Sequence, residues 1–223
     1  MSKMKNKAFT LAETLIVMGI IGVVAALTLP NLNSSTGDKE KVTHLMKIYT
    51  NLNDVIGRAQ AVYGPVGEWF INDSSDTDRI KRMGNRLTEF LKVTKNCENA
   101  SNHTSCTGST LGNSYYSFIL ADGASVRING DTAGSRMFFG IYLGGPTKNY
   151  NWPNDPFLFN LDLNTGILEP AGQNYQNCFS YGNNGNCTAW VINNGNFDAK
   201  YNSGGRCSNS SIILDGVTNT SCK

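Results

Sequence analysis

The order of apolar and polar residues predicts, first, a long apolar helix near the start of the chain. Phe9–Leu29 is a run of 21 residues in which Glu13 is the only charged side chain. At about 1.5 Å rise per residue, such a helix covers the roughly 30 Å hydrocarbon core of a membrane. A charge in a segment of this kind costs on the order of 2.5–3.5 kcal/mol on insertion scales, so it normally has a partner. The pattern predicts a membrane-spanning helix whose single acid needs a partner.

A second helical pattern follows Pro30 and a polar stretch at residues 31–37. From about residue 38 to 63, apolar side chains recur at spacings of three and four, which places them on one face of a helix. We interpret this face as one packed on a sheet rather than as a coiled-coil seam. Pro30 lacks a backbone N–H, so it is expected to kink or locally melt the joined helix. The residues of the face are Val42, Leu45, Tyr49, Leu52, Ile56, Ala59 and Tyr63.

Beyond Gly64-Pro65 the periodicity predicts one more helix and then strands. The helix is expected over about residues 76–93, with Ile80, Met83, Leu87, Phe90 and Leu91 as its apolar residues. Asp122-Gly123 between two apolar runs is a strong hairpin signal, because both residues tolerate positive φ. The fold class is therefore α+β, a long N-terminal helix packed on an antiparallel sheet with irregular loops. Strands are expected at Tyr115–Ala121, Ala124–Asn129, Met137–Leu143, Phe157–Leu163, Ile167–Leu168, Thr188–Ile192 and Ser211–Leu214.

Composition places most of the chain outside the cytoplasm. The 19 basic residues exceed the 17 acidic ones only because of Lys3, Lys5 and Lys7 ahead of the apolar run. Lysines on that side predict a cytoplasmic leader, one membrane crossing and an external domain. A nearly neutral remainder gives no general case for nucleic-acid binding. Many Asn, Gly, Ser and Thr residues suit a loop-rich external domain rather than a helical enzyme.

Six cysteines support the same compartment, because an even number outside the cytoplasm indicates disulfides. Neighbouring cysteines enclose short polar segments, so we favour sequential pairing among the fifteen possible connectivities. None of the close spacings typical of zinc ligands is present. The favoured pairs are Cys97 with Cys106, Cys178 with Cys187, and Cys207 with Cys222.

The sequence offers little for catalysis, and we predict no enzyme activity and no cofactor. Neither His44 nor His103 belongs to a nucleophile, metalloprotease or phosphate-loop motif, and both are interpreted as surface or boundary residues. The acidic pairs Asp76 with Asp78 and Asp155 with Asp162 fit turn and cap roles better than acid–base roles. A calcium site in Gly144–Asp162, with Asn154, Asp155 and Asp162 as oxygen ligands, is the lesser alternative to no metal.

The segment Ala8-Phe9-Thr10-Leu11-Ala12-Glu13, with a basic leader before it and the apolar run after it, resembles the prepilin signal. This signal marks the type IV pilin superfamily, which includes the pseudopilins of type II secretion systems. The resemblance implies that a prepilin peptidase cuts between Ala8 and Phe9 and methylates the new Phe9 amine. It also implies that Glu13 pairs with the Phe9 amine of a neighbouring subunit. Ala8 stands where the family usually has glycine, and its small side chain still fits a narrow subsite.

The resemblance extends loosely to three later stretches, Leu120–Gly123, Pro153–Leu163 and Cys187–Ile192, which are similar to secretion-type pseudopilins. It implies a pilin fold with a leader at residues 1–8 and a membrane and assembly helix at 9–29. The amphipathic half of that helix at 30–63 and an extracytoplasmic domain at 64–223 complete the division. Small Gly19 and Gly22, with Ala25 and Ala26, allow helices to approach closely, and a proline such as Pro30 permits local melting in a filament.

The implied function is that of a structural subunit held in the bacterial inner membrane and then assembled into a pilus or pseudopilus. Its partners would be other pilin-like subunits, the prepilin peptidase and the inner-membrane assembly platform. Alternatives stay open: a secretory signal cut after Ala26, a plain membrane anchor, or a minor tip subunit that binds a surface or DNA. A membrane-anchored enzyme is a further class without a supporting motif.

Overall fold

The computed structural model of the chain describes residues 11–71, 73, 75–98, 106, 115–130, 134–146, 156–173, 175, 178 and 184–197, with the backbone alone at 25–36. The chain comprises two compact units, Met1–Glu40 and Lys41–Lys223.

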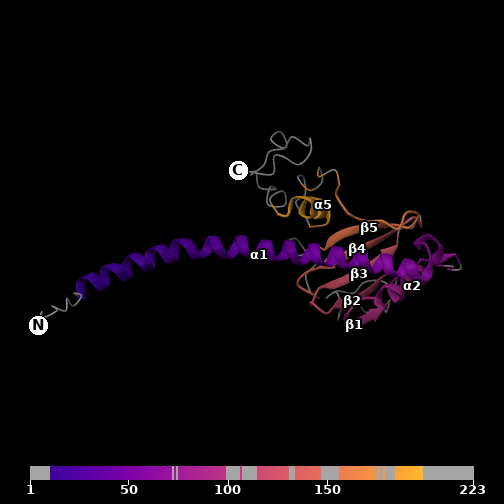
Figure 1. The fold of residues 1–223 in the computed structure, drawn as a ribbon, viewed down its shortest axis with the longest axis horizontal. Coiled ribbons are helices and arrows are strands. Elements are labelled where there is room, and N and C mark those ends of the chain that lie inside the picture. Colours follow the sequence, from indigo (N-terminus) through magenta and orange to yellow (C-terminus); the bar gives the residue numbers. More distant parts are fainter. Residues whose placement is uncertain are drawn as a thin grey trace, which may run out of the picture. The chain divides into compact units, whose positions relative to one another are not determined.

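Helix α1 (Leu11–Tyr63) begins in the first unit and ends in the second (Figure 1). It continues through Pro30, so the local melting expected there is absent from this single chain. Proline removes one backbone hydrogen bond of a helix, and the neighbouring turns keep theirs.

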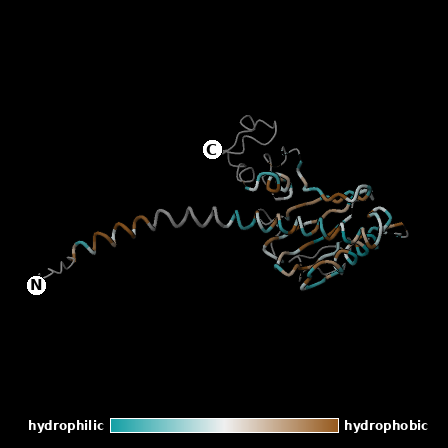
Figure 2. The backbone as a smooth tube through the Cα atoms, in the orientation of Figure 1, coloured by the Kyte–Doolittle hydropathy of each residue, from teal (hydrophilic) through white to brown (hydrophobic). Residues whose placement is uncertain are grey.

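In the first unit, the described part of α1 presents apolar side chains to its surroundings. Residues 11–24 are all exposed, and their large apolar side chains range from 54% exposed at Val17 and Val24 to 79% at Leu11. Figure 2 shows this segment as the hydrophobic start of the helix. An apolar surface of this extent on one helix indicates contact with lipid or with another protein.

The second unit is built on one sheet of six antiparallel strands in the order β1-β2-β3-β4-β5-β6. Neighbours in the chain are neighbours in the sheet, as expected for a meander. The predicted Asp122-Gly123 hairpin is confirmed between β2 and β3, where Gly123 has a φ of +88°. The strands are β1 (Val93–Glu98), β2 (Tyr116–Leu120), β3 (Ser125–Gly130), β4 (Arg136–Tyr142), β5 (Phe157–Asp162) and β6 (Leu168–Pro170).

The predicted apolar face of α1 forms the core with one face of this sheet. Five of its seven residues are buried, and Tyr49 and Tyr63 at its edge are half-buried. The Tyr49 ring stacks on Phe159 of β5 with centroids 5.1 Å apart, and its hydroxyl donates to the Leu168 carbonyl at 3.1 Å. The face is wider than the sequence pattern indicated, because Ile48 and Val55 are also buried.

The second predicted helix is shorter than expected. After the short 3-10 helix η1 (Val66–Phe70), helix α2 covers Asp76–Thr88 rather than residues 76–93. Ser75 caps its start by accepting a hydrogen bond from the Asp78 N–H at 3.2 Å. Residues 89–92 form a turn and a short connection instead, and strand β1 begins at Val93. This edge strand is mostly polar and exposed, so it gave no alternating apolar signal.

A second prediction was wrong at Thr188–Ile192, which is part of helix α5 (Asn184–Asn194) rather than a strand. The β-branched composition favours a strand, but tertiary contacts override it. Thr188 accepts a hydrogen bond from the Leu158 N–H at 2.9 Å and donates to the Gly185 carbonyl at 3.2 Å. These contacts join α5 to β5. The strand predicted at Ser211–Leu214 lies outside the described residues.

Gly84 sets how closely α2 approaches the sheet. It is buried in α2, and a Cβ added there would lie 2.3–2.5 Å from three ring atoms of Tyr116. The Tyr116 ring is fully buried, and its hydroxyl donates to Asn85 at 2.9 Å and accepts from Asn96 at 2.7 Å. The ring therefore has little freedom to move away.

Gly84→Ala is expected to destabilise the domain by at least about 1–3 kcal/mol, the usual cost of overpacking a core. Urea unfolding followed by tryptophan fluorescence measures this. Gly57→Ala is the matched control, because Gly57 lies in α1 with no atom within 4 Å of an added Cβ. There alanine is expected to stabilise by roughly 0.5–1 kcal/mol. Equal effects of the two substitutions would contradict the close approach at Gly84.

Candidate assembly segment

Glu13 lies in the first turn of α1, within the exposed apolar segment. Gly19 and Gly22 follow on the same segment, and no atom lies within 4 Å of a Cβ added at either. Residues three apart lie on one side of a helix. The described segment therefore combines an acid, exposed apolar side chains and two neighbouring positions without side chains.

Of the other residues predicted for this segment, Pro30 is described only by its backbone. Pro30 lies within α1, and Ala8 and Phe9 lie outside the described residues. Within the part of the chain that is described, no helix is both long enough and apolar enough to cross a membrane.

Two of the three expected disulfides are present, Cys97–Cys106 and Cys178–Cys187. The first joins Cys97 of the edge strand β1 to Cys106, whose carbonyl accepts a hydrogen bond from the Ser125 hydroxyl of β3. The second fixes the start of α5, and Trp190 packs on its buried sulfurs. Both agree with sequential pairing. Cys207 and Cys222 lie outside the described residues.

Those candidate catalytic and metal-binding residues that the structure describes make contacts that stabilise the fold. His44 lies within α1 and is half-buried, with Nε2 3.0 Å from Asp122 Oδ2 but without hydrogen-bond alignment. Asp78 accepts a hydrogen bond from Ser75 at 2.7 Å, and Asp76 lies 3.7 Å from Arg79. These contacts are those of helix capping. Of the described His, Cys, Asp and Glu residues, no three gather as a metal site. His103, Asn154 and Asp155 lie outside the described residues.

Asp162, the last calcium candidate, holds the turn between β5 and β6. Its Oδ1 accepts the N–H groups of Asn164 at 2.8 Å and Thr165 at 3.0 Å. These two hydrogen bonds, the one from Thr165 being the stronger cause, lower the pKa of Asp162. Asp162, which the sequence analysis paired with Asp155, is thus a turn residue.

Asp162→Asn keeps an acceptor oxygen but loses the charge, so it tests the pH dependence of this turn. Because folding lowers the pKa, the ionised form favours the folded state above about pH 4 and loses this advantage as the pH falls through the folded-state pKa. We expect the melting temperature of the wild type to exceed that of the variant near pH 6. The difference should shrink below about pH 4, and a constant difference across this range would contradict the assignment.

Sequence reasoning missed the contacts that join α2 to the end of α1. The Arg86 guanidinium lies over the rings of Tyr63 at 4.5 Å and Trp69 at 5.1 Å. Burial, and secondarily Arg82, lowers the pKa of Arg86. The Tyr63 hydroxyl donates to Glu89, a hydrogen bond that raises the pKa of Tyr63. The only sequence signal for these contacts was the helical spacing of Arg82, Arg86 and Glu89. This spacing does not indicate which aromatic residues they contact.

Taken together, these observations define an α+β protein with an N-terminal helix, an antiparallel six-stranded sheet and disulfides, an architecture consistent with the pilin fold. A family model described as the prokaryotic N-terminal methylation motif matches residues 3–29. Searches of curated proteins and of solved structures gave no match. The chain carries a type IV pilin-like prepilin signal.

Proposed function

We propose that this chain is a structural subunit of a type IV pilus-like or type II secretion pseudopilus filament. A prepilin peptidase processes it between Ala8 and Phe9, and the segment at residues 9–29 anchors it in the inner membrane before assembly. The observation that carries this proposal is the N-terminal methylation motif at residues 3–29. It coincides with the only long apolar run of the sequence.

The described part of the segment supports assembly through helix packing. Its apolar side chains are exposed along 14 residues, 11–24, and neighbouring subunits would cover them in a filament. Gly19 and Gly22 leave room for a second helix to approach. Glu13 would set the axial register of each subunit by pairing with the methylated Phe9 amine of its neighbour. In a low-dielectric bundle such a pair is held to one geometry, because an unpaired charge there is costly.

The folded domain supports a location outside the cytoplasm. Its two disulfides form and persist in oxidising compartments. The sheet and α1 share one buried core. Of the two filaments, we favour the secretion pseudopilus because of the similarity at Leu120–Gly123, Pro153–Leu163 and Cys187–Ile192.

The test is incorporation into filaments by the tagged full-length chain, expressed in cells that have a prepilin peptidase and an assembly platform. Filaments are sheared from the cells, sedimented and probed for the tag. A structural subunit is expected in the sheared fraction in an amount that rises with its expression. A minor tip subunit would be present at a few copies per filament and would not rise. Retention of the chain in the membrane fraction, with filaments present, would overturn the proposal.

A further inference from the structure

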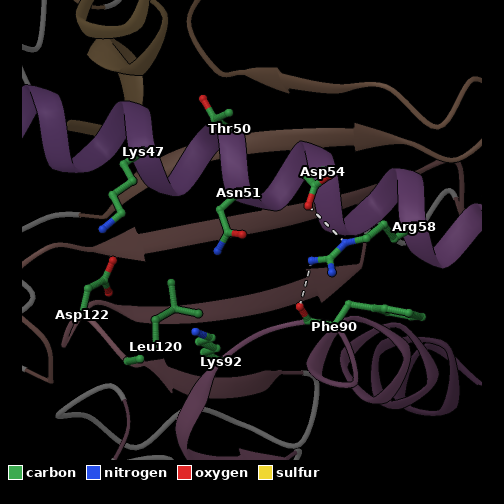
Figure 3. Close-up of a pocket in the computed structure, with 10 residues that line it drawn as sticks. Lys47, Thr50, Asn51, Asp54, Arg58, Phe90, Lys92, Leu120 and Asp122 are labelled. Carbon is green, nitrogen blue, oxygen red and sulfur yellow. Dashed lines mark hydrogen bonds and ion pairs between the residues drawn. The ribbon is translucent and has the colours of Figure 1, made fainter.

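The folded domain has a groove of about 900 Å³ beside α1. One wall is the solvent-facing side of α1, and the other is the connection from α2 to β1 together with the β2–β3 turn (Figure 3). All of its residues belong to the second compact unit. The groove is lined by Lys47, Thr50, Asn51, Asp54, Arg58, Phe90, Lys92, Leu120, Ala121 and Asp122.

Both acids of the groove already have contacts within the folded domain. Asp54 Oδ2 lies 3.1 Å from Arg58 Nε, and Arg58 also donates to the Phe90 carbonyl at 3.0 Å. Asp122 Oδ2 lies 3.0 Å from His44, and its Oδ1 accepts the Ala124 N–H at 3.2 Å. Asp54 is thus paired with Arg58 of its own helix (Figure 3), and Asp122 lies beside His44 of α1.

The two lysines of the groove, unlike the acids, have no side-chain partner among the described residues. Among the described residues, no side-chain hydrogen bond or ion pair joins Lys47 or Lys92 to another group, and both are exposed. They extend from opposite walls, Lys47 from α1 and Lys92 from the segment before β1. Three cationic side chains and two acidic ones line the groove, so its net charge is positive, and the two lysines extend into it from both sides.

The dimensions and lining suit an extended peptide. Lys47 and Arg58 are 11 residues apart on α1, or about 16 Å at 1.5 Å per residue. About five residues of extended chain cover this length at roughly 3.3 Å each. Phe90, at the Arg58 end, supplies apolar surface. The Asn51 carboxamide supplies both a donor and an acceptor for a peptide backbone.

We propose that this groove binds an acidic, extended segment of a partner protein, about five residues long, with its carboxylates on Lys47 and Lys92. A nucleic acid fits less well. Its phosphates follow one another along the strand, so those between the lysines would lie near Asp54 and Asp122 and be repelled. A peptide can instead turn its N–H groups toward these two acids and its apolar side chains toward Phe90. The inference goes beyond the filament role and does not depend on it.

The experiment uses the full chain in a nonionic detergent and a fluorescein-labelled peptide, Glu-Leu-Glu-Leu-Glu, with binding followed by fluorescence anisotropy. The uncharged peptide Gln-Leu-Gln-Leu-Gln is the ligand control. K47Q/K92Q removes both lysines of the groove. K81Q/K95Q is the matched protein control, because Lys81 and Lys95 are exposed and do not line the groove. Circular dichroism confirms that each variant is folded.

Saturable binding of the acidic peptide is expected, about tenfold weaker in K47Q/K92Q and unchanged in K81Q/K95Q. The uncharged peptide should bind much more weakly than the acidic one. Absence of binding at low salt, or equal weakening in both variants, would overturn the proposal. Displacement of the peptide by oligothymidylate at an equal or lower concentration would also overturn it, in favour of a nucleic-acid site. Displacement by inorganic phosphate, beyond that by chloride at the same ionic strength, would indicate a small-anion site instead.

Discussion

Ala8→Trp is expected to leave the leader on the chain. Hydrolysis of the Ala8–Phe9 bond requires that the side chain before the bond enter a peptidase subsite, and in this signal the residue is small, alanine here and glycine usually. Tryptophan is too large for such a subsite, so processing should fall to background. The measurement is the intact mass of the protein after expression with a prepilin peptidase.

Ala8→Gly is the control for this prediction. Glycine is smaller than alanine, so processing by the same peptidase should be kept or improved. Complete removal of residues 1–8 from the Ala8→Trp variant would show that the bond is chosen without regard to the residue before it. Blocked processing in both variants would contradict the argument from side-chain size, because glycine is smaller than alanine.

Glu13→Ala is expected to abolish filament incorporation while leaving membrane insertion and the folded domain intact. In the proposed filament this carboxylate pairs with a methylated amine in a low-dielectric bundle. Removal of one partner from such a pair costs about 3–5 kcal/mol, because the other charge stays buried. Multiplied over many subunits, this loss prevents growth of the filament. The readout is the ratio of tagged chain in sheared filaments to tagged chain in membranes.

Glu13→Gln and Glu13→Asp separate charge from shape. Glutamine keeps the length of the side chain without the charge and should fail like alanine. Aspartate keeps the charge with a shorter reach and should retain part of the incorporation. If Glu13→Ala entered filaments as well as the wild type, Glu13 would have no role in register. The melting temperature of the folded domain should be the same in all variants, since Glu13 lies in the other compact unit.

The sequence predicted most of this fold because its strongest signals are local. The face from Val42 to Tyr63 repeats over several helical turns, so its core role was readable without knowledge of the sheet. Asp122-Gly123 marked a tight turn by its backbone preferences alone, and Gly123 has the positive φ that such a turn needs. Alternation in β5 likewise matches its burial, in which Phe157, Phe159 and Leu161 face the core.

The errors came from segments whose structure depends on distant contacts. Strand β1 is an edge strand with exposed Thr94, Lys95 and Asn96, so it lacks the alternation that identifies a strand. Residues 188–192 form a helix because packing on β5 and the Cys178–Cys187 disulfide outweigh their β-branched composition. The groove beside α1 could not be predicted for the same reason. Lys47 and Lys92 line the same groove only after the sheet has formed.

The proposed assembly segment was likewise predicted in part from the sequence and in part only from the structure. Its acid, its small residues and its cleavage point were named from one short motif, because the prepilin signal is contiguous in the sequence. The structure adds that residues 11–24 expose their apolar side chains and that Gly19 and Gly22 leave open space. Which surface of the folded domain contacts a partner required the three-dimensional arrangement of charges.

The central claim is that this chain is processed as a prepilin, and the intact mass of the wild-type protein produced beside a prepilin peptidase tests it most directly. Fragmentation of the same sample locates the new N-terminus. The account predicts a chain that begins at Phe9 and carries a methyl group on its amine. A chain that begins after Ala26 would contradict the account, because the assembly segment with Glu13 would have been removed.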